Sequence, residues 1–95
     1  MMKKAEDYAK AIMRDETEKF ASEKTITHTD NYIERLYEFH DGAVVKYEWQ
    51  GLPLNAEKPE EIYNHRFTLI KLPSPNPNNL KLGVIKVINY PKRNA

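Results

Sequence analysis

Two charged side chains stand where the sequence pattern requires apolar residues. Glu16 continues the apolar stripe of the first segment, which reads as a helix, and Arg35 lies on the apolar face of a later strand. An unpaired charge on a core face is costly, so each residue predicts the other as its ion-pair partner. His28 and His65 fall on the same predicted face. The four side chains could line a pocket for a small anionic ligand or form a weak acid–base site.

Simpler interpretations compete with that pocket. Glu16 and Arg35 could lie at the rim of the core, with their alkyl stems packed and their charged heads in water. His28 and His65 could be ordinary buried histidines, because the sequence contains no HxH, HxxxH or HExxH spacing. The pair His40-Asp41 occupies a predicted tight turn, where an aspartate has the structural role of bonding the local backbone. We therefore predict no metal site and no cofactor.

The motifs of common enzyme classes are absent. Three glycines cannot build a phosphate-cradling loop, and the lack of cysteine removes disulfides, thiolate metal sites and cysteine nucleophiles. Neither a GxSxG sequence nor a kinase signature occurs. The sequence therefore favours a protein that acts without catalysis, and no catalytic residue is predicted.

An aliphatic strip on the outer face of the predicted sheet favours a protein partner. The early strands carry mostly charged residues on that face, whereas the last two strands do not. A contiguous exposed apolar patch usually marks a binding surface. We predict a homodimer, or contact with another protein, through the outer face of the C-terminal hairpin; the alternative is coverage by the loop 51–59. The predicted interface consists of Leu36, Val44, Ile70, Leu72, Leu80, Leu82, Val84 and Ile88.

Charge is distributed unevenly along a chain of net charge +1. Residues 1–50 carry eight Lys and Arg against eleven Asp and Glu, whereas residues 51–95 carry seven against three. The basic C-terminal half makes nucleic-acid binding a second alternative, although a pI of about 7.9 is low for a dedicated nucleic-acid binder. The acidic and basic halves could instead meet across a dimer. The candidate nucleic-acid contacts are Arg66, Lys71, Lys81, Lys86, Lys92 and Arg93.

Hydrophobic periodicity sets the expected elements. Residues 3–21 predict one amphipathic helix, because apolar residues recur at spacings of three and four and neither Gly nor Pro interrupts them. After Lys24 the period changes to two, which is typical of strands. The predicted strands are residues 25–29, 32–39, 43–50, 62–72 and 80–90.

The apolar sets also fix the register of the predicted hairpin between residues 32 and 50. A three-residue loop at 40–42 pairs Tyr37 with Val45, whereas a two-residue loop would place apolar residues opposite charged ones. The longer loop leaves Gly42 where a left-handed backbone conformation is needed. We therefore predict the three-residue connection.

The last hairpin is placed in the same way. Pairing Leu72 with Leu80 sets His65 opposite Val87 on the core face.

The whole chain of 95 residues is long enough for one domain. The sequence shows neither a signal peptide nor a long apolar run, so we expect a cytoplasmic protein that does not enter a membrane. The predicted fold is α+β, with an N-terminal amphipathic helix packed on one face of a four- to five-stranded antiparallel meander.

Overall fold

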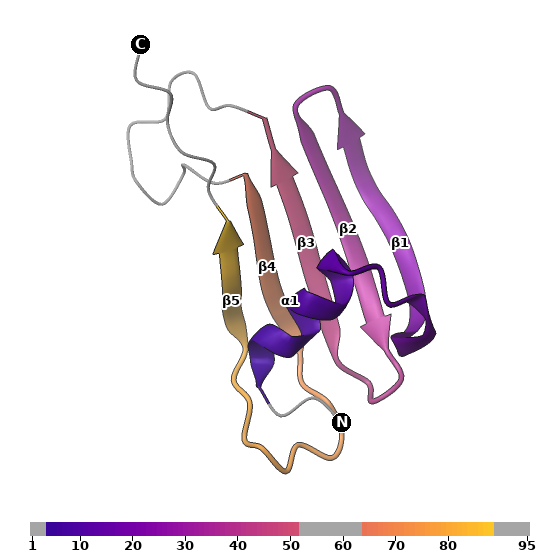
Figure 1. Ribbon diagram of the computed structural model, residues 1–95, viewed down its shortest axis with the longest axis vertical. Helices are drawn as coiled ribbons and strands as arrows, with labels where there is room; N and C mark the ends of the chain where they lie inside the picture. The colour runs from indigo at the N-terminus through magenta and orange to yellow at the C-terminus, as the bar shows by residue number, and fades with distance from the viewer. Residues whose placement is uncertain (1–3, 52–63, 89–95) are drawn as a thin grey trace.

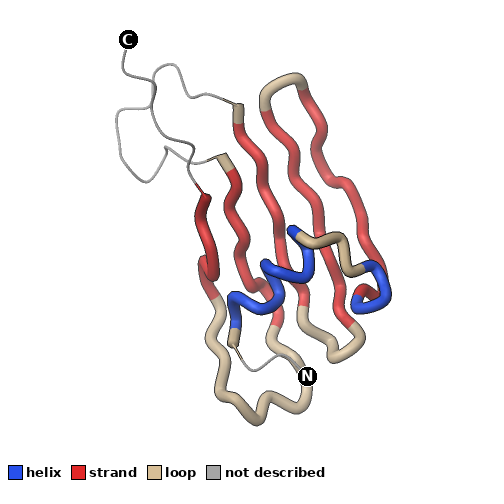
Figure 2. Tube along the Cα trace, viewed as in Figure 1, coloured by secondary structure: helices blue, strands red, loops and turns tan. Residues whose placement is uncertain are grey.

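The computed structural model describes residues 4–51 and 64–88, which form one helix packed on a five-stranded antiparallel sheet (Figures 1 and 2). The strand order is β1-β2-β3-β4-β5, so each strand pairs with the next along the chain. This arrangement confirms the predicted α+β meander. Among the described residues, no helix has the length and apolar character needed to cross a lipid bilayer. The elements are α1 (Ala5–Met13), the 3₁₀ turn η1 (Thr17–Lys19), β1 (Phe20–Thr29), β2 (Tyr32–Phe39), β3 (Val44–Gln50), β4 (His65–Lys71) and β5 (Gly83–Ile88).

The helix is much shorter than predicted, because the chain closes it at Met13 and does not continue to residue 21. Asp15 adopts a left-handed conformation with a φ of 53°. Its amide donates to the carbonyl of Ile12 at 3.1 Å, and the amide of Glu16 donates to that of Ala11 at 3.0 Å. These two bonds form a Schellman motif, in which Asp15 takes the place that glycine usually occupies.

β1 begins at Phe20 and not at residue 25, because the short helix leaves residues 20–24 available to pair with β2. Phe20 pairs with Phe39. Its ring lies 5.3 Å from that of Phe39 and 5.0 Å from that of Tyr37, measured between centroids. The segment predicted as the end of the helix therefore becomes part of the sheet and adds to its core.

The hairpin between β2 and β3 has the predicted register. Tyr37 pairs with Val45, and the amide of Phe39 donates to the carbonyl of Ala43 at 2.8 Å. Gly42 has a φ of 92°, which a residue with a side chain rarely adopts. The three-residue connection is therefore confirmed.

A bulge in β5 reverses the predicted orientation of the last residues of the strand. Ile85 is an extra residue in the ladder, and beyond it His65 pairs with Ile88 and not with Val87. One extra residue exchanges the two faces of the strand that follows. Val87, predicted in the core, is 43% exposed, and Ile88, predicted on the outer face, packs against the core.

A second bulge acts in the same way in β4. Leu69 and Lys71 pair with consecutive residues of β3, so Ile70 is extra. Leu72 therefore turns inward and packs against the core, and Leu80 is buried beside it in the core cluster. The prediction of an outward position for Leu72 and Leu80 is wrong.

Tyr8 connects the helix to the loops at one end of the sheet. Its side chain is fully buried, and its hydroxyl donates to Asp41 Oδ2 at 2.5 Å. Asp41 Oδ1 accepts the amide of Ala43 at 3.0 Å, and the carbonyl of Asp41 accepts the amide of Ser74 at 2.9 Å. Burial, reinforced by the hydrogen bond to Asp41, raises the pKa of Tyr8 well above its ordinary value. The predicted structural role of the turn aspartate is confirmed.

Candidate functional site

A cleft of about 590 Å³ opens on the face of the sheet that α1 covers, at the C-terminal end of the helix. The helix crosses this face obliquely over the lower half of the sheet as drawn in Figure 1, and the upper half of the strands has no helix over it. Small-molecule sites have volumes of about 300–1,000 Å³, so the cleft is large enough for a small organic ligand. It is lined by Ile12, Met13 and Asp15 from the helix end and by Arg35, Tyr37, Tyr47, His65, Phe67 and Ile88 from the sheet.

The sheet register explains why these side chains converge. Arg35 pairs with Tyr47, and Tyr47 pairs with Phe67, so the three residues lie side by side on three neighbouring strands. Paired residues of an antiparallel sheet point to the same face, and so do residues two apart in one strand. Tyr37 and His65 therefore join them on the helix side.

Arg35 is the cation of the cleft. Its Nη2 donates to Glu23 Oε1 on the neighbouring strand at 3.0 Å, and its Cζ lies 5.5 Å from the centroid of the Tyr37 ring. The Nε of Arg35 is buried and has no hydrogen-bond partner. A buried N–H without an acceptor costs about 1–3 kcal/mol, so this guanidinium has donor capacity that the protein itself leaves unused.

Tyr47 and His65 form a second polar group in the cleft. A hydrogen bond of 2.7 Å joins the Tyr47 hydroxyl and His65 Nδ1, and the two rings lie within 20° of parallel. Burial lowers the pKa of His65, which favours the neutral imidazole at neutral pH. Burial likewise raises the pKa of Tyr37, so its phenol stays protonated. Arg35 is therefore the cationic side chain among the lining residues at neutral pH.

The structure brings together two of the four predicted pocket residues, Arg35 and His65. The predicted ion pair between Glu16 and Arg35 is wrong. Glu16 follows the end of the helix and pairs with Lys19, whose Nζ lies 2.8 Å from Glu16 Oε1, while Arg35 pairs with Glu23. The hydrogen bond to Glu16 raises the pKa of Lys19.

His28 lies outside the cleft lining. It is exposed on the edge strand β1, opposite Ile33. Sequence reasoning missed Met13 and Asp15, which the helix end contributes to the cleft. The available signal was the charged run 14–16, which interrupts the apolar stripe and marks the point where the helix stops.

Of the predicted interface, Leu82 and Val84 are each 57% exposed and Ile70 is 43% exposed. Leu36 and Val44 are half-buried on the same face. The loop 51–59, the predicted alternative cover of this face, lies outside the described residues apart from Gly51.

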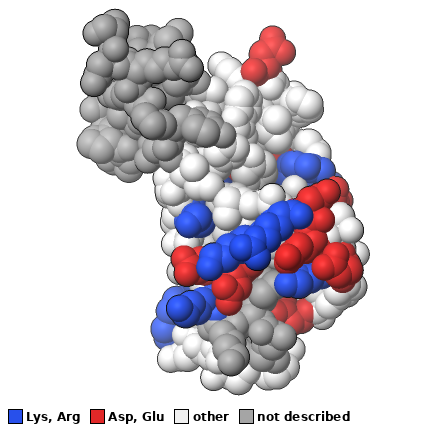
Figure 3. Space-filling model, in the orientation of Figure 1, with Lys and Arg blue, Asp and Glu red and all other residues white. Residues whose placement is uncertain are grey.

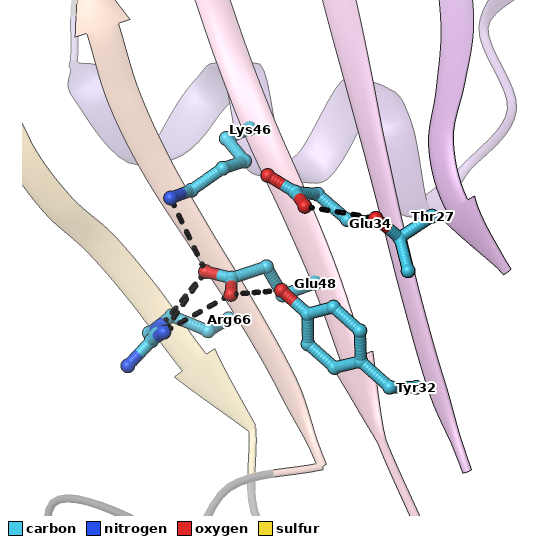
Figure 4. Close-up of polar contacts among 6 residues, drawn as sticks. All are labelled: Thr27, Tyr32, Glu34, Lys46, Glu48 and Arg66. Carbon is cyan, nitrogen blue, oxygen red and sulfur yellow. Dashed lines mark hydrogen bonds and ion pairs between the residues drawn. The ribbon is translucent and has the colours of Figure 1, made fainter. Parts of the chain in front are cut away.

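Arg66, one of the candidate nucleic-acid contacts, belongs to a polar cluster on the outer face of the sheet (Figure 4). Its Nε and Nη2 donate to the two carboxylate oxygens of Glu48 at 3.0 and 3.1 Å, and the hydroxyl of Tyr32 donates to the same carboxylate at 2.6 Å. Lys46 Nζ lies 3.9 Å from Glu48 Oε1. Glu48 is only 4% exposed, so the charge of Arg66 neutralises a buried acid within the chain.

The other candidate nucleic-acid contacts do not form one basic surface on the helix side. In Figure 3, Lys and Arg side chains on that side alternate with Asp and Glu. Lys71 and Lys81 are exposed and Lys86 is half-buried, while Lys92 and Arg93 lie outside the described residues. Within the part of the chain that the structure describes, no three His, Cys, Asp or Glu side chains are grouped so as to hold a metal ion.

Comparisons of the chain with protein-family models, with curated proteins and with solved structures found no match. The function must therefore be inferred from the cleft and the outer face of the sheet themselves.

Proposed function

We propose that the protein binds a small amphipathic organic anion, a carboxylate with an apolar body, in the cleft at the end of α1. The observation that carries this proposal is the Nε of Arg35, which is buried without an acceptor in a residue that lines a cleft of about 590 Å³. A carboxylate would supply the missing acceptor, because guanidinium and carboxylate groups match in geometry and charge.

The pair between Arg35 and Glu23 does not prevent this use. Arg35 Nη2 and Glu23 Oε1 are joined by one hydrogen bond of 3.0 Å, and both side chains are more than a third exposed. Ion pairs of this kind contribute about 0–1 kcal/mol, so the guanidinium can turn toward a ligand at little cost. A guanidinium has five N–H donors and could keep Glu23 while it binds a second carboxylate.

The remaining walls suit the apolar body of such a ligand. The lining includes Ile12 and Met13 from the helix end and Phe67 and Ile88 from the sheet. Met13 is 44% exposed, so a ligand that covers it would remove apolar surface from water. Binding sites for small molecules commonly combine such walls with one or two polar groups that fix orientation.

A matched pair of probes tests the charge requirement. We expect 3-phenylpropionate to bind and the neutral 3-phenylpropionamide to bind at least tenfold more weakly, because a hydrogen bond to a charged group contributes about 1.5–3 kcal/mol. Isothermal titration gives the affinities. Proton and nitrogen NMR of the 95-residue chain shows whether signals of Arg35 and His65 shift on titration.

The substitution Arg35→Gln tests whether Arg35 is the source of the preference for the charged probe. It should remove the preference for the carboxylate and leave the weak binding of the amide unchanged. Arg14→Gln, the same change at an exposed position outside the cleft lining, should bind both probes like the parent. Equal affinity for carboxylate and amide in the parent, or an undiminished preference in Arg35→Gln, would refute the proposal.

A further inference from the structure

The cleft at the end of α1 contains a second polar group besides Arg35. The Tyr47 hydroxyl and His65 Nδ1 are joined by a hydrogen bond of 2.7 Å, and both residues belong to the cleft lining. Neither residue is fully buried. A carboxylate held by Arg35 uses only the guanidinium and gives this pair no role. The pair is therefore a candidate contact for a second functional group of the same ligand.

The two polar groups lean away from each other across the sheet. The guanidinium of Arg35, on β2, reaches toward β1, where Glu23 Oε1 lies 3.0 Å from its Nη2. The hydroxyl of Tyr47, on β3, reaches the opposite way, to His65 on β4. Neighbouring strands are about 4.8 Å apart, so these two contacts lie about two strand spacings, or about 10 Å, apart across the sheet. A ligand that touches both must carry its polar groups at opposite ends.

Aromatic rings border the space between these two groups. The centroid of the Tyr47 ring lies 5.0 Å from that of Phe67 and 5.9 Å from that of His65. On the other side, the Tyr37 ring lies 5.5 Å from Arg35 Cζ. Aromatic rings pack favourably on one another at centroid distances of about 4.5–7 Å. An aromatic ring is therefore a suitable body for the ligand.

The hydrogen-bonding character of the Tyr47–His65 pair defines the second group. Burial lowers the pKa of His65, and a neutral imidazole has one donor and one acceptor. If Nδ1 accepts the proton of Tyr47, the phenol oxygen can still accept and Nε2 donates. If Nδ1 donates instead, the phenol can still donate and Nε2 accepts. A hydroxyl group matches either arrangement, because it both donates and accepts.

We infer that the ligand is an aromatic hydroxy acid, whose carboxylate binds Arg35 and whose hydroxyl binds the Tyr47–His65 pair. This inference rests on the proposed function, because it concerns the same cleft and the same anion. A hydroxyl that leaves water without finding a partner weakens binding. Tyr47 and His65 replace the lost bonds to water, and they are therefore the residues that select a hydroxylated ligand over its unsubstituted analogue.

Pairs of acids that differ by one hydroxyl test this selection. Isothermal titration of the whole chain compares 3-(4-hydroxyphenyl)propionate with 3-phenylpropionate, and 4-(4-hydroxyphenyl)butyrate with 4-phenylbutyrate. We expect the hydroxyl to raise the affinity at least threefold in one pair or both, because one net hydrogen bond contributes about two- to tenfold. The second pair is one methylene longer, so a ligand that is too short does not decide the outcome.

The substitution Tyr47→Phe tests whether the pair is the source of this gain, because it keeps the ring and removes the hydroxyl. It should abolish the gain and bind the two acids without a hydroxyl like the parent. Tyr32→Phe, the same change on the outer face of the sheet, should keep the gain. In the parent itself, the imidazole nitrogen signals of His65 in NMR spectra should shift more with the hydroxylated acid than with its unsubstituted analogue.

Several outcomes overturn the inference: a gain below threefold in both pairs, a gain that persists in Tyr47→Phe or is lost in Tyr32→Phe, or equal shifts of the His65 signals. The same titrations test the proposed function separately, through the preference of the parent for 3-phenylpropionate over its amide. A parent that shows this preference but ignores the hydroxyl refutes the inference alone. A parent without the preference refutes both, since the inference requires the bound carboxylate.

Discussion

Replacing Tyr8 by phenylalanine isolates one hydrogen bond of the core. The hydroxyl of Tyr8, a fully buried residue, donates to Oδ2 of the half-buried Asp41 at 2.5 Å. Phenylalanine keeps the ring, and so keeps its edge contact with Phe39, whose centroid lies 4.7 Å away. Only one oxygen atom is removed, so the cavity left behind is small.

The expected loss follows from this geometry. A hydrogen bond to a charged group contributes about 1.5–3 kcal/mol to folding. Asp41 keeps the amide of Ala43 as a partner and is half-buried, so its carboxylate is not left without a donor. We therefore expect Tyr8→Phe to lower the free energy of unfolding by about 2 kcal/mol, which corresponds to a fall in Tm of about 8–16 °C in a domain of this size.

The same substitution has a signature at alkaline pH. The pKa of Tyr8 is raised in the folded protein, so above about pH 10 the unfolded chain loses this proton first. The folded state then binds more protons than the unfolded state, and stability falls as pH rises, by up to about 1.4 kcal/mol per pH unit from this group. Tyr8→Phe should remove that contribution and make the alkaline decline less steep.

Urea unfolding at pH 7 and between pH 9.5 and 11 measures both effects. Tyr37→Phe is the matched control at pH 7, because Tyr37 is also buried but its hydroxyl has no hydrogen bond to a described residue. We expect that control to change stability by less than about 0.5 kcal/mol. If Tyr8→Phe is no worse than Tyr37→Phe, or if the alkaline slope is unchanged, the bond to Asp41 does not stabilise the fold as argued.

Four further results are expected from urea unfolding. Gly42→Ala should destabilise the protein by about 1–2 kcal/mol, because its φ of 92° suits no side chain. Asp15→Gly should stabilise it by about 0.5–1 kcal/mol, because glycine is favoured in the left-handed position that ends α1. Glu48→Gln should cost about 2 kcal/mol, less than a fully buried pair, because its partner Arg66 is partly exposed. Because the pKa of His65 is lowered, the unfolded chain binds this proton more tightly and stability should fall as pH drops below about 6.5; His65→Gln should reduce that slope.

The parts of the fold that the sequence predicted depend on local patterns. The β2–β3 register follows from alternating apolar residues and from one glycine placed where the turn needs it, and both signals act within a few residues. The presence of α1 follows from spacings of three and four. The meander follows from the general tendency of strands that are consecutive in the chain to pair with each other.

The predictions from sequence failed where a single residue interrupted the regular hydrophobic periodicity of a helix or strand. Asp15 adopts the left-handed conformation without being glycine, so neither Gly nor Pro marked the helix end, and the charged run 14–16 was the one signal there. Ile70 and Ile85 are apolar residues in apolar strands, yet each is an extra residue that exchanges the faces beyond it. Bulges depend on how the whole sheet twists and closes on its helix, which short-range patterns do not record.

The partner of Arg35 shows the same limit for the candidate site. An unpaired charge on the core face correctly indicated that Arg35 was unusual, but several acids could have reached it. Glu23 is the acid that pairs with Arg35, because β1 begins as early as Phe20 and places Glu23 beside Tyr37 on β2. That extension depends in turn on the early end of the helix.

The position at which α1 ends therefore explains both the error in the predicted length of the helix and the presence of the cleft. Nine helical residues span about 13 Å, whereas the predicted nineteen would span about 28 Å at 1.5 Å per residue. Five strands spaced by about 4.8 Å cover about 19 Å, so the longer helix would cross the whole sheet. It would lie over the side chains that now line the cleft, among them Arg35, Tyr47 and His65. A left-handed aspartate at position 15 thus leaves open a cation and two aromatic groups that a regular helix would have covered, and these are the groups on which the proposed anion site depends.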